Sequence, residues 1–436
     1  MRSETQTRKL RSRRRDFWRS FPLGLIDTSD LPLKVPGIAV YLIGAAWVWD
    51  KQGAALSFME NTPLISPTME ALLQNIFVVY LLLGALALVI LMLYPVGRKA
   101  VEDELQRVGL TNHNGDAPRL LRKHRDLEHP KLTIWEFDNR GIPQKEWEDK
   151  QGKIETALDV TVAKVCYGKS KRRVLLYAVP TRNSLPERID WQDGFLSKED
   201  FILALGESLL GPVTVDLDKV PHILLGGSTG SGKSLLLKLL LMQSLRKGSE
   251  VYIADFKGGV DFPRAWRENC RMCFTETDLL QVLDQLVAIL KERTELFSNA
   301  GCDKLSAYNR IAAHPLPRLI FACDEVAEML DRTGRSKGDK EVLGQIENKL
   351  STLARLGRAF GIHLILATQR PDANVIPGQI KSNLDFRVCG RADNILSQII
   401  LDNTSAADQI PKDARGRFIT GDGNVFQAYL LDEKQL

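Results

Sequence analysis

The sequence predicts an α/β protein whose parallel sheet carries a phosphate-binding loop. Apolar runs of strand length, among them HILLGG at 222–227 and VYIADF at 251–256, alternate with stretches of helical pattern. The glycine-rich segment GSTGSGKS at 227–234 stands between the first of these runs and the helical LLLKLLLMQSL at 235–245. Strands that alternate with helices form parallel sheets, which bind ligands at the carboxyl ends of their strands.

The chain has 436 residues, enough for two or three domains, and its charge is concentrated at one end. The net charge is +5, yet eight basic residues and only two acidic ones lie before position 20. We interpret residues 1–32 as a basic cytoplasmic tail at a membrane surface, because a hydrophobic segment follows it. The six cysteines are scattered, which fits a reducing compartment better than a disulfide scaffold.

Two apolar segments predict a transmembrane hairpin within residues 33–97. The segment NIFVVYLLLGALALVILMLY at 75–94 has no charged residue and is long enough to cross a bilayer. The segment VPGIAVYLIGAAWVW at 35–49 is shorter and contains a proline. Because basic residues precede the first segment and follow the second, both ends of the hairpin are expected in the cytoplasm. We therefore expect a multi-pass protein of the cell membrane, with its N-terminus and its nucleotide-binding domain in the cytoplasm.

The middle of the chain predicts a linker and a small domain. Residues 98–130 are charged and lack a clear period, so we expect a linker with some helix. Residues 131–200 are expected to form a small β-α-β-β domain, for which a structural role is the simpler interpretation. Its strand, helix and two further strands are expected at 131–138, 143–159, 160–167 and 172–179. Residues 201–436 then form the nucleotide-binding domain.

The segment GSTGSGKS has both the residues and the setting of a P-loop for ATP. Its glycines let backbone N–H groups turn toward phosphate, and the helix that follows adds the positive end of its dipole. The catalytic Lys233 would reach the β- and γ-phosphates, and Ser234 would ligate Mg²⁺. The predicted nucleotide-binding residues are Gly227, Ser228, Thr229, Gly230, Ser231, Gly232, Lys233 and Ser234.

Two further strand-like runs end in polar residues suited to ATP hydrolysis. In PRLIFACDEV, Asp324 is placed to hold Mg²⁺ and Glu325 to polarise the attacking water. The run IHLILAT is followed by Gln369 and Arg370, which are placed to sense the γ-phosphate. Because the carboxyl ends of parallel strands meet at one edge of a sheet, we expect these groups beside the P-loop.

These motifs and several longer segments resemble successive blocks of the FtsK/SpoIIIE motor domain. The blocks include ALGESLLGPVTVDLDKVPHILLGGSTGSGKS, DEVAEML, GRAFGIHLILATQRPDANVIPGQIKSNLDFRV and RGRFI, and they cover about 204–431. The resemblance implies a RecA-like motor that assembles as a homo-hexamer and uses ATP to thread double-stranded DNA through the ring. Residues 131–200 resemble the small domain that precedes this motor in the family.

The resemblance also implies residues that act between subunits and on DNA. Such rings need an arginine from the neighbouring subunit to stabilise transition-state charge. Arg358, Arg387 and Arg391 are the candidates, and we favour Arg387 and Arg391, which follow the sensor strand. The loop DRTGRSKGDK at 331–340 resembles in position the family segments that face the pore, although a solvated mobile loop explains its composition equally well. The expected DNA-binding residues are Arg332, Arg335 and Lys337.

Two departures from the chromosome-segregation members of the family point to conjugation. The sequence ends just past the motor, without the winged-helix module that reads DNA polarity in those members. It also has two expected spans with a short outside loop. This architecture resembles the TcpA-like coupling proteins of Gram-positive conjugative elements, which implies a relaxase and conjugation-channel proteins as partners.

Three alternatives remain open at this stage. The chain could be a protein-export ATPase of the EccC type, whose DFKGG segment resembles residues 255–259, although those proteins usually carry several motors in tandem. It could also be a translocase for chromosome or DNA segregation. A membrane receptor that does not hydrolyse ATP is the third alternative, against which Lys233, Asp324 and Glu325 argue.

Overall fold

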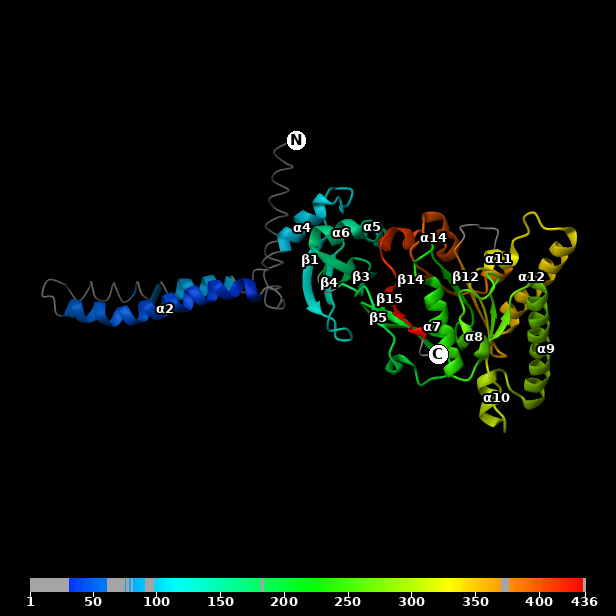
Figure 1. Cartoon of the computed structure of the whole chain (residues 1–436). Coiled ribbons are helices and arrows are strands. Elements are labelled where there is room, and N and C mark those ends of the chain that lie inside the picture. The colour runs from blue at the N-terminus through cyan, green and yellow to red at the C-terminus, as the bar shows by residue number, and fades with distance from the viewer. Residues whose placement is uncertain are drawn as a thin grey trace. The chain divides into compact units, whose positions relative to one another are not determined.

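The computed structural model describes residues 31–60, 75, 78–79, 81–90, 98–181, 184–369 and 376–433. The chain divides into two compact units, residues 1–184 and 185–436, whose elements are drawn in Figure 1. Residues 1–30 of the expected basic tail lie outside the described residues, as does Arg370 of the expected γ-phosphate sensor.

The first expected membrane segment lies within helix α2 (Leu31–Glu60), which extends beyond it at both ends. Of the second segment, the helical residues 75, 78–79 and 81–90 are described, and the rest lies outside the described residues. Within the described ranges, no helix combines the length and the apolar character that a membrane crossing needs.

The two apolar segments touch through one tyrosine. The Tyr41 hydroxyl donates a hydrogen bond to the Leu81 carbonyl at 3.0 Å. A Cβ atom at Gly84 would overlap the Tyr41 ring, so glycine is needed for this close approach.

An antiparallel sheet with the strand order β1-β2-β4-β3 forms the small domain of the first unit. Its elements are α4 (Arg98–Arg107), β1 (Arg119–Arg125), β2 (Thr133–Asp138), α5 (Gln144–Asp149), α6 (Gln151–Leu158), β3 (Val160–Tyr167) and β4 (Arg173–Pro180). The three helices and the sheet share one apolar core, in which Phe137 of β2 contacts Trp147 of α5 with ring centroids 5.0 Å apart.

Within the expected linker at 98–130, helix α4 agrees with the helix expected there, whereas strand β1 was not predicted. Strand β1 has the sequence RLLRKHR, and only Leu120 of it is fully buried. An edge strand with a single buried side chain shows no hydrophobic alternation, which is why sequence periodicity did not reveal it. Its cations instead contact strand β2: Arg122 pairs with Glu136 at 2.5 Å, and the Lys123 ammonium lies 3.5 Å from the Trp135 ring centroid.

The second unit contains a mixed sheet with the strand order β10-β9-β11-β12-β8-β13-β14-β15-β6-β7, and β5 pairs with β15. The strands are β5 (Ile189–Asp190), β6 (Ile202–Ser208), β7 (Gly211–Asp216), β8 (Ile223–Gly226), β9 (Glu250–Ala254), β10 (Arg271–Cys273), β11 (Leu319–Cys323), β12 (Ile362–Thr368), β13 (Phe386–Cys389), β14 (Arg417–Thr420) and β15 (Val425–Leu430).

Along this strand order, the expected parallel pairing extends from β10 to β13, and the short strand β5 also pairs parallel with β15. Strands β13, β14, β15, β6 and β7 pair antiparallel. The connections between β6 and β7 and between β14 and β15 are short hairpin turns, and a parallel crossover needs a dozen or more residues. The unit also begins before the expected boundary at 201, because β5 joins its sheet and Trp191 packs in its core.

Helices cover both faces of this sheet. They are α7 (Lys233–Arg246), α8 (Arg264–Asn269), α9 (Glu276–Ala300), α10 (Leu305–Ile311), α11 (Val326–Leu330), α12 (Lys337–Leu356), α13 (Gly378–Lys381), α14 (Asn394–Leu401) and α15 (Ser405–Gln409). Alternate residues of the central strands face opposite cores: Ile223 and Leu225 pack with α7, whereas Leu224 packs in the core of α9 and α12. Helices α9 and α12 lie side by side (Figure 1).

Candidate nucleotide-binding site

Three neighbouring parallel strands bring the predicted site residues to one edge of the sheet. Strand β12 lies between β11 and β8, with Thr368 opposite Gly226 and Leu366 opposite Cys323. The P-loop follows β8, Asp324 and Glu325 follow β11, and Gln369 follows β12. The strand order therefore places the β12 end between the P-loop and the acidic pair.

The P-loop adopts a backbone shape that depends on glycine. Gly230 and Gly232 have φ angles of 77° and 100°, in the left-handed region that other residues avoid. A Cβ atom at Gly232 would also lie 3.2 Å from the Gly416 nitrogen, so there is little space for a side chain. Helix α7 begins at the next residue, Lys233, which directs its first N–H groups into the loop.

Lys233, Ser234 and Asp324 form a buried polar cluster at the start of α7. The Lys233 ammonium donates to the Asp324 carboxylate at 2.8 Å and also to the Asp324 main-chain carbonyl. The Ser234 hydroxyl lies 2.9 and 3.1 Å from the two carboxylate oxygens of Asp324. Burial alone would raise the pKa of Asp324, but Lys233 and Ser234 outweigh that effect and lower it. Asp324 therefore stays charged at neutral pH.

Glu325 is held in one orientation by the end of β12. The Thr368 hydroxyl donates to its carboxylate at 2.7 Å, and the Gln369 N–H donates at 3.0 Å. Glu325 is 6% exposed, and an ionised carboxylate offers about four acceptor sites, so positions remain for the protons of a water molecule. The side chain of Gln369 accepts a hydrogen bond of 2.9 Å from the Thr229 hydroxyl of the P-loop.

These residues fit ATP and Mg²⁺. The glycine-dependent loop and the start of α7 present N–H donors, which suit an anion such as a phosphate group. Ser234 and Asp324 supply one hydroxyl and one carboxylate, which are oxygen ligands of the kind Mg²⁺ takes in sites completed by nucleotide phosphates. The structure thus brings together all the predicted residues of the P-loop, the metal site, Glu325 and Gln369.

The two favoured arginines lie in contacts within the chain. Arg387 pairs with Asp402 and donates to the Leu384 carbonyl at 3.0 Å. Arg391 donates to the carbonyls of Thr229 at 2.6 Å and Lys412 at 2.7 Å, so it braces the P-loop of its own chain. Strand β13 pairs parallel with β8, so Arg391, which follows β13, lies beside the P-loop, which follows β8.

Arg358, the third candidate, donates to the Asp218 carbonyl at 3.1 Å. This contact joins the exposed Arg358 to the half-buried Asp218 and involves none of the nucleotide-site residues described above.

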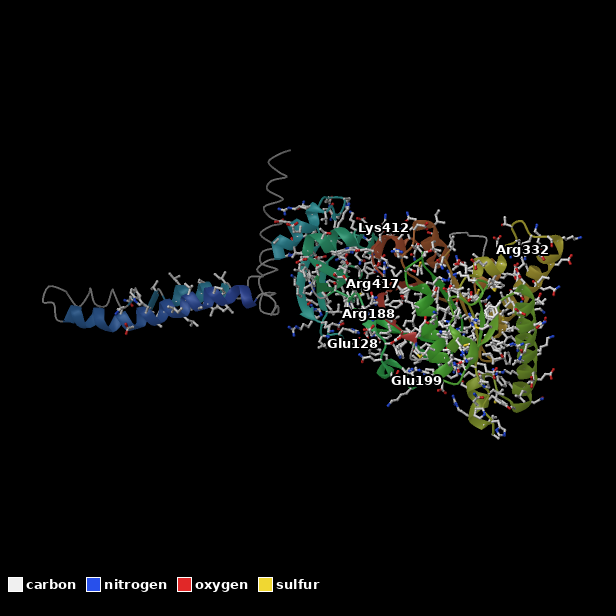
Figure 2. All side chains as sticks on the ribbon, viewed as in Figure 1. Glu128, Arg188, Glu199, Arg332, Lys412 and Arg417 are labelled. Atoms are coloured by element: carbon white, nitrogen blue, oxygen red, sulfur yellow. The ribbon has the colours of Figure 1, made fainter. Side chains whose placement is uncertain are left out.

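The three expected DNA contacts lie in the loop between α11 and α12 and at the start of α12. Arg332, labelled in Figure 2, pairs with Glu347, and Arg335 pairs with Glu276 at 3.1 Å. Lys337 is the exposed first residue of α12, which begins after a capping box formed by Ser336 and Asp339. The loop is therefore exposed and basic, and two of its cations have acidic partners in the same chain.

Two residues that sequence reasoning did not assign also reach the site. Thr368 orients Glu325, as described above. Lys257 follows β9, and its ammonium lies 3.5 Å from Asp324 and 3.1 Å from Asp261. The segment DFKGG, which contains Lys257, resembles a segment of protein-export ATPases, but that likeness gave Lys257 no role. Its position just after a strand of the same parallel sheet could have indicated that Lys257 lies near the site.

The part of the chain that contains this site resembles known proteins. A sequence model of the FtsK/SpoIIIE family matches residues 191–373. The DNA translocase FtsK of Helicobacter pylori (strain J99 / ATCC 700824) is 32% identical over 228 residues, which cover 48% of this chain and 25% of that protein. The DNA translocase FtsK of Halalkalibacterium halodurans is 30% identical over 244 residues, which cover 51% of this chain and 29% of that protein. The chain thus spans less than a third of the length of these relatives.

One solved structure matches most of the chain. The pCW3 conjugation coupling protein TcpA, in its monomer form with ATPγS, is 32% identical with a TM-score of 0.59. The match covers 78% of this chain and 96% of that one.

Proposed function

Because the chain belongs to the FtsK/SpoIIIE family and carries its P-loop ATPase domain, we propose that it is a membrane-anchored, ATP-driven DNA translocase. We further propose that it acts as a coupling protein in conjugative DNA transfer. The observation that carries this second step is the match to the conjugation coupling protein TcpA, which extends over 96% of that chain.

Each residue of the site would have a separate role in ATP hydrolysis. Bound ATP·Mg²⁺ would supply the bond to be cleaved and a Lewis acid beside the γ-phosphate. Lys233 and the first N–H groups of α7 would hold the phosphates, while Ser234 and Asp324 would hold the metal. Glu325 would accept the proton of the attacking water in the orientation that Thr368 imposes.

Gln369 connects two parts of the nucleotide site. Its main-chain N–H contacts Glu325 and its side chain contacts Thr229, so one residue joins the hydrolytic carboxylate to the P-loop. A shift of the P-loop on binding or loss of phosphate would therefore displace Gln369 at the end of β12.

We propose that Arg332, Arg335 and Lys337 grip the DNA backbone in a homo-hexameric ring. The ion pairs of Arg332 and Arg335 lie at the surface, where such pairs contribute about 0 to 1 kcal/mol. Exchanging a surface carboxylate for a DNA phosphate therefore costs little. Contacts of this kind are independent of DNA sequence and weaken with salt.

Membrane anchoring is supported by the apolar surface of the two N-terminal helical segments. Large apolar side chains on both are exposed within the chain, including Val40, Ile43, Leu82 and Leu86, which are 72%, 70%, 64% and 56% exposed. A lipid bilayer is the medium that covers such a surface without penalty. We propose that the ATPase domain lies on the cytoplasmic side, with relaxase and channel proteins as further partners.

ATP hydrolysis by the detergent-solubilised chain tests the translocase proposal. We expect double-stranded DNA to accelerate hydrolysis, and Glu325→Gln to bind ATP but hydrolyse it far more slowly with or without DNA. Stimulation by a secreted peptide but by no DNA would instead favour protein export. Lys233→Ala in donor cells should abolish conjugative transfer, and normal transfer by this variant would refute the coupling role.

A further inference from the structure

Lys257 contacts the carboxylate that is expected to hold Mg²⁺. It follows strand β9, and β9 pairs with β11 so that Ala254 lies opposite Cys323. This register brings the segment after β9 level with Asp324. The Lys257 ammonium lies 3.5 Å from the Asp324 Oδ2 atom. Lys257 is therefore a second cation, beside Lys233, on one carboxylate that is only 5% exposed.

The main chain around Lys257 is held in place rather than free. The Lys257 N–H donates to the Asp255 carboxylate at 3.0 Å. Gly258 and Gly259 follow in the left-handed region, with φ angles of 74° and 80°. Arg267 donates to the Gly259 carbonyl at 2.8 Å, which closes the turn. The approach of Lys257 to Asp324 is thus set by its supporting turn and not by a long side chain alone.

The side chain of Lys257 has two acidic partners that differ in exposure. Asp324 is buried, whereas Asp261 is 37% exposed and lies 3.1 Å from the same ammonium group. Lys257 already donates a hydrogen bond to Asp261 while it lies beside Asp324, so it can move away from Asp324 and keep an ion pair. This movement needs only a rotamer change of a flexible lysine.

The Asp324 carboxylate has limited room for ligands. Lys233 and Ser234 already donate to it, and a carboxylate has about four acceptor sites. A monovalent ammonium and a divalent metal ion beside the same oxygen repel each other, because both are cations within a few ångströms. We propose that Lys257 competes with Mg²⁺ for Asp324 and thereby sets the Mg²⁺ concentration at which the site loads nucleotide.

This inference rests on the proposed function only in requiring nucleotide and Mg²⁺ to bind at this site. Asp261 then keeps Lys257 as an ion-pair partner when Mg²⁺ occupies Asp324. Removing Lys257 should make Mg²⁺ binding easier, whereas removing Asp261 should leave Lys257 on Asp324 and make it harder.

The experiment is a Mg²⁺ titration of the full chain in detergent, at a fixed concentration of fluorescent ADP and without DNA. Lys257→Gln should lower the half-saturating Mg²⁺ concentration about threefold to tenfold, as expected for the loss of a partly exposed competing ion pair. Asp261→Asn should raise it. Lys257→Arg keeps the cation and should behave like the parent chain, as should Lys349→Gln, which breaks a lysine–aspartate pair elsewhere in the domain.

An unchanged or higher half-saturating Mg²⁺ concentration in Lys257→Gln would overturn the proposal. So would a shift of the same sign in Lys257→Gln and Asp261→Asn, because damage to the turn moves both variants alike and competition moves them apart. DNA is absent from the titration, so a failure of the translocase proposal would leave this result unaffected.

Discussion

Acid should destabilise the ATPase domain through two buried histidines at the end of the sheet opposite the nucleotide site. His222 immediately precedes β8 and His363 lies in β12, and they are 0% and 1% exposed. The His222 Nδ1 atom accepts from the Leu364 N–H at 3.0 Å, and the His363 Nδ1 atom lies 3.0 Å from the Pro221 carbonyl. The His363 Nε2 atom is buried without a hydrogen-bond partner among the described residues.

Burial disfavours the charged form of both rings. It lowers the pKa of His222 to about 4. Burial, together with the positive charge of Arg318, lowers the pKa of His363 to about 3. Both histidines are therefore neutral in the folded domain at every pH above 5.

The sign and size of the effect follow from proton linkage. Below the unfolded pKa of about 6.5 the unfolded chain binds protons that the folded domain does not, so stability falls as the pH falls. Between pH 7 and pH 5 each histidine accounts for a loss of about 2 kcal/mol in the free energy of unfolding. Carboxylates titrate mostly below this window, because their unfolded pKa values lie near 4.

Urea unfolding of residues 185–436, which form a compact unit, measures this loss through tryptophan fluorescence. The expected decrease is about 4 kcal/mol between pH 7 and pH 5 for the two histidines together. In the double variant His222→Asn, His363→Asn the amides can replace the Nδ1 contacts but cannot titrate, so its stability should depend much less on pH. An equal decrease in that variant would refute the assignment to these histidines.

Three further changes have expected outcomes. Gln243→Leu should lower the free energy of unfolding by about 2 to 4 kcal/mol in urea titrations, because the buried amide bonds both the N–H and the carbonyl of Ala204. Arg391→Ala should weaken binding of fluorescent ADP about threefold to tenfold, because it removes the brace on the P-loop carbonyl, and unchanged affinity would exclude that role. Gly232→Ala should abolish nucleotide binding in the same assay, because the new Cβ atom meets both a strained φ angle and the Gly416 backbone. Normal binding by this variant would show that the loop tolerates another backbone shape.

The nucleotide site was predictable because its chemistry is local in sequence. The segment GSTGSGKS specifies a turn and a helix start within a few residues, and apolar strands of the central sheet stand out as continuous runs. Strand β1 was not predictable in this way, because it buries only Leu120 and its sequence lacks a hydrophobic period. The antiparallel half of the sheet was missed because two of its pairs, β13 with β14 and β15 with β6, join strands that are far apart along the chain.

The sequence by itself determined the P-loop, the acidic pair after β11 and the polar residue after β12, since each is a short motif beside a buried strand. Only the tertiary structure decided how these groups meet. The order β9-β11-β12-β8 places Gln369 between Glu325 and Thr229 and brings Lys257 to Asp324. It also turns Arg391 toward the P-loop of its own chain. Strand order arises from packing between distant segments, and no local pattern of residues encodes it.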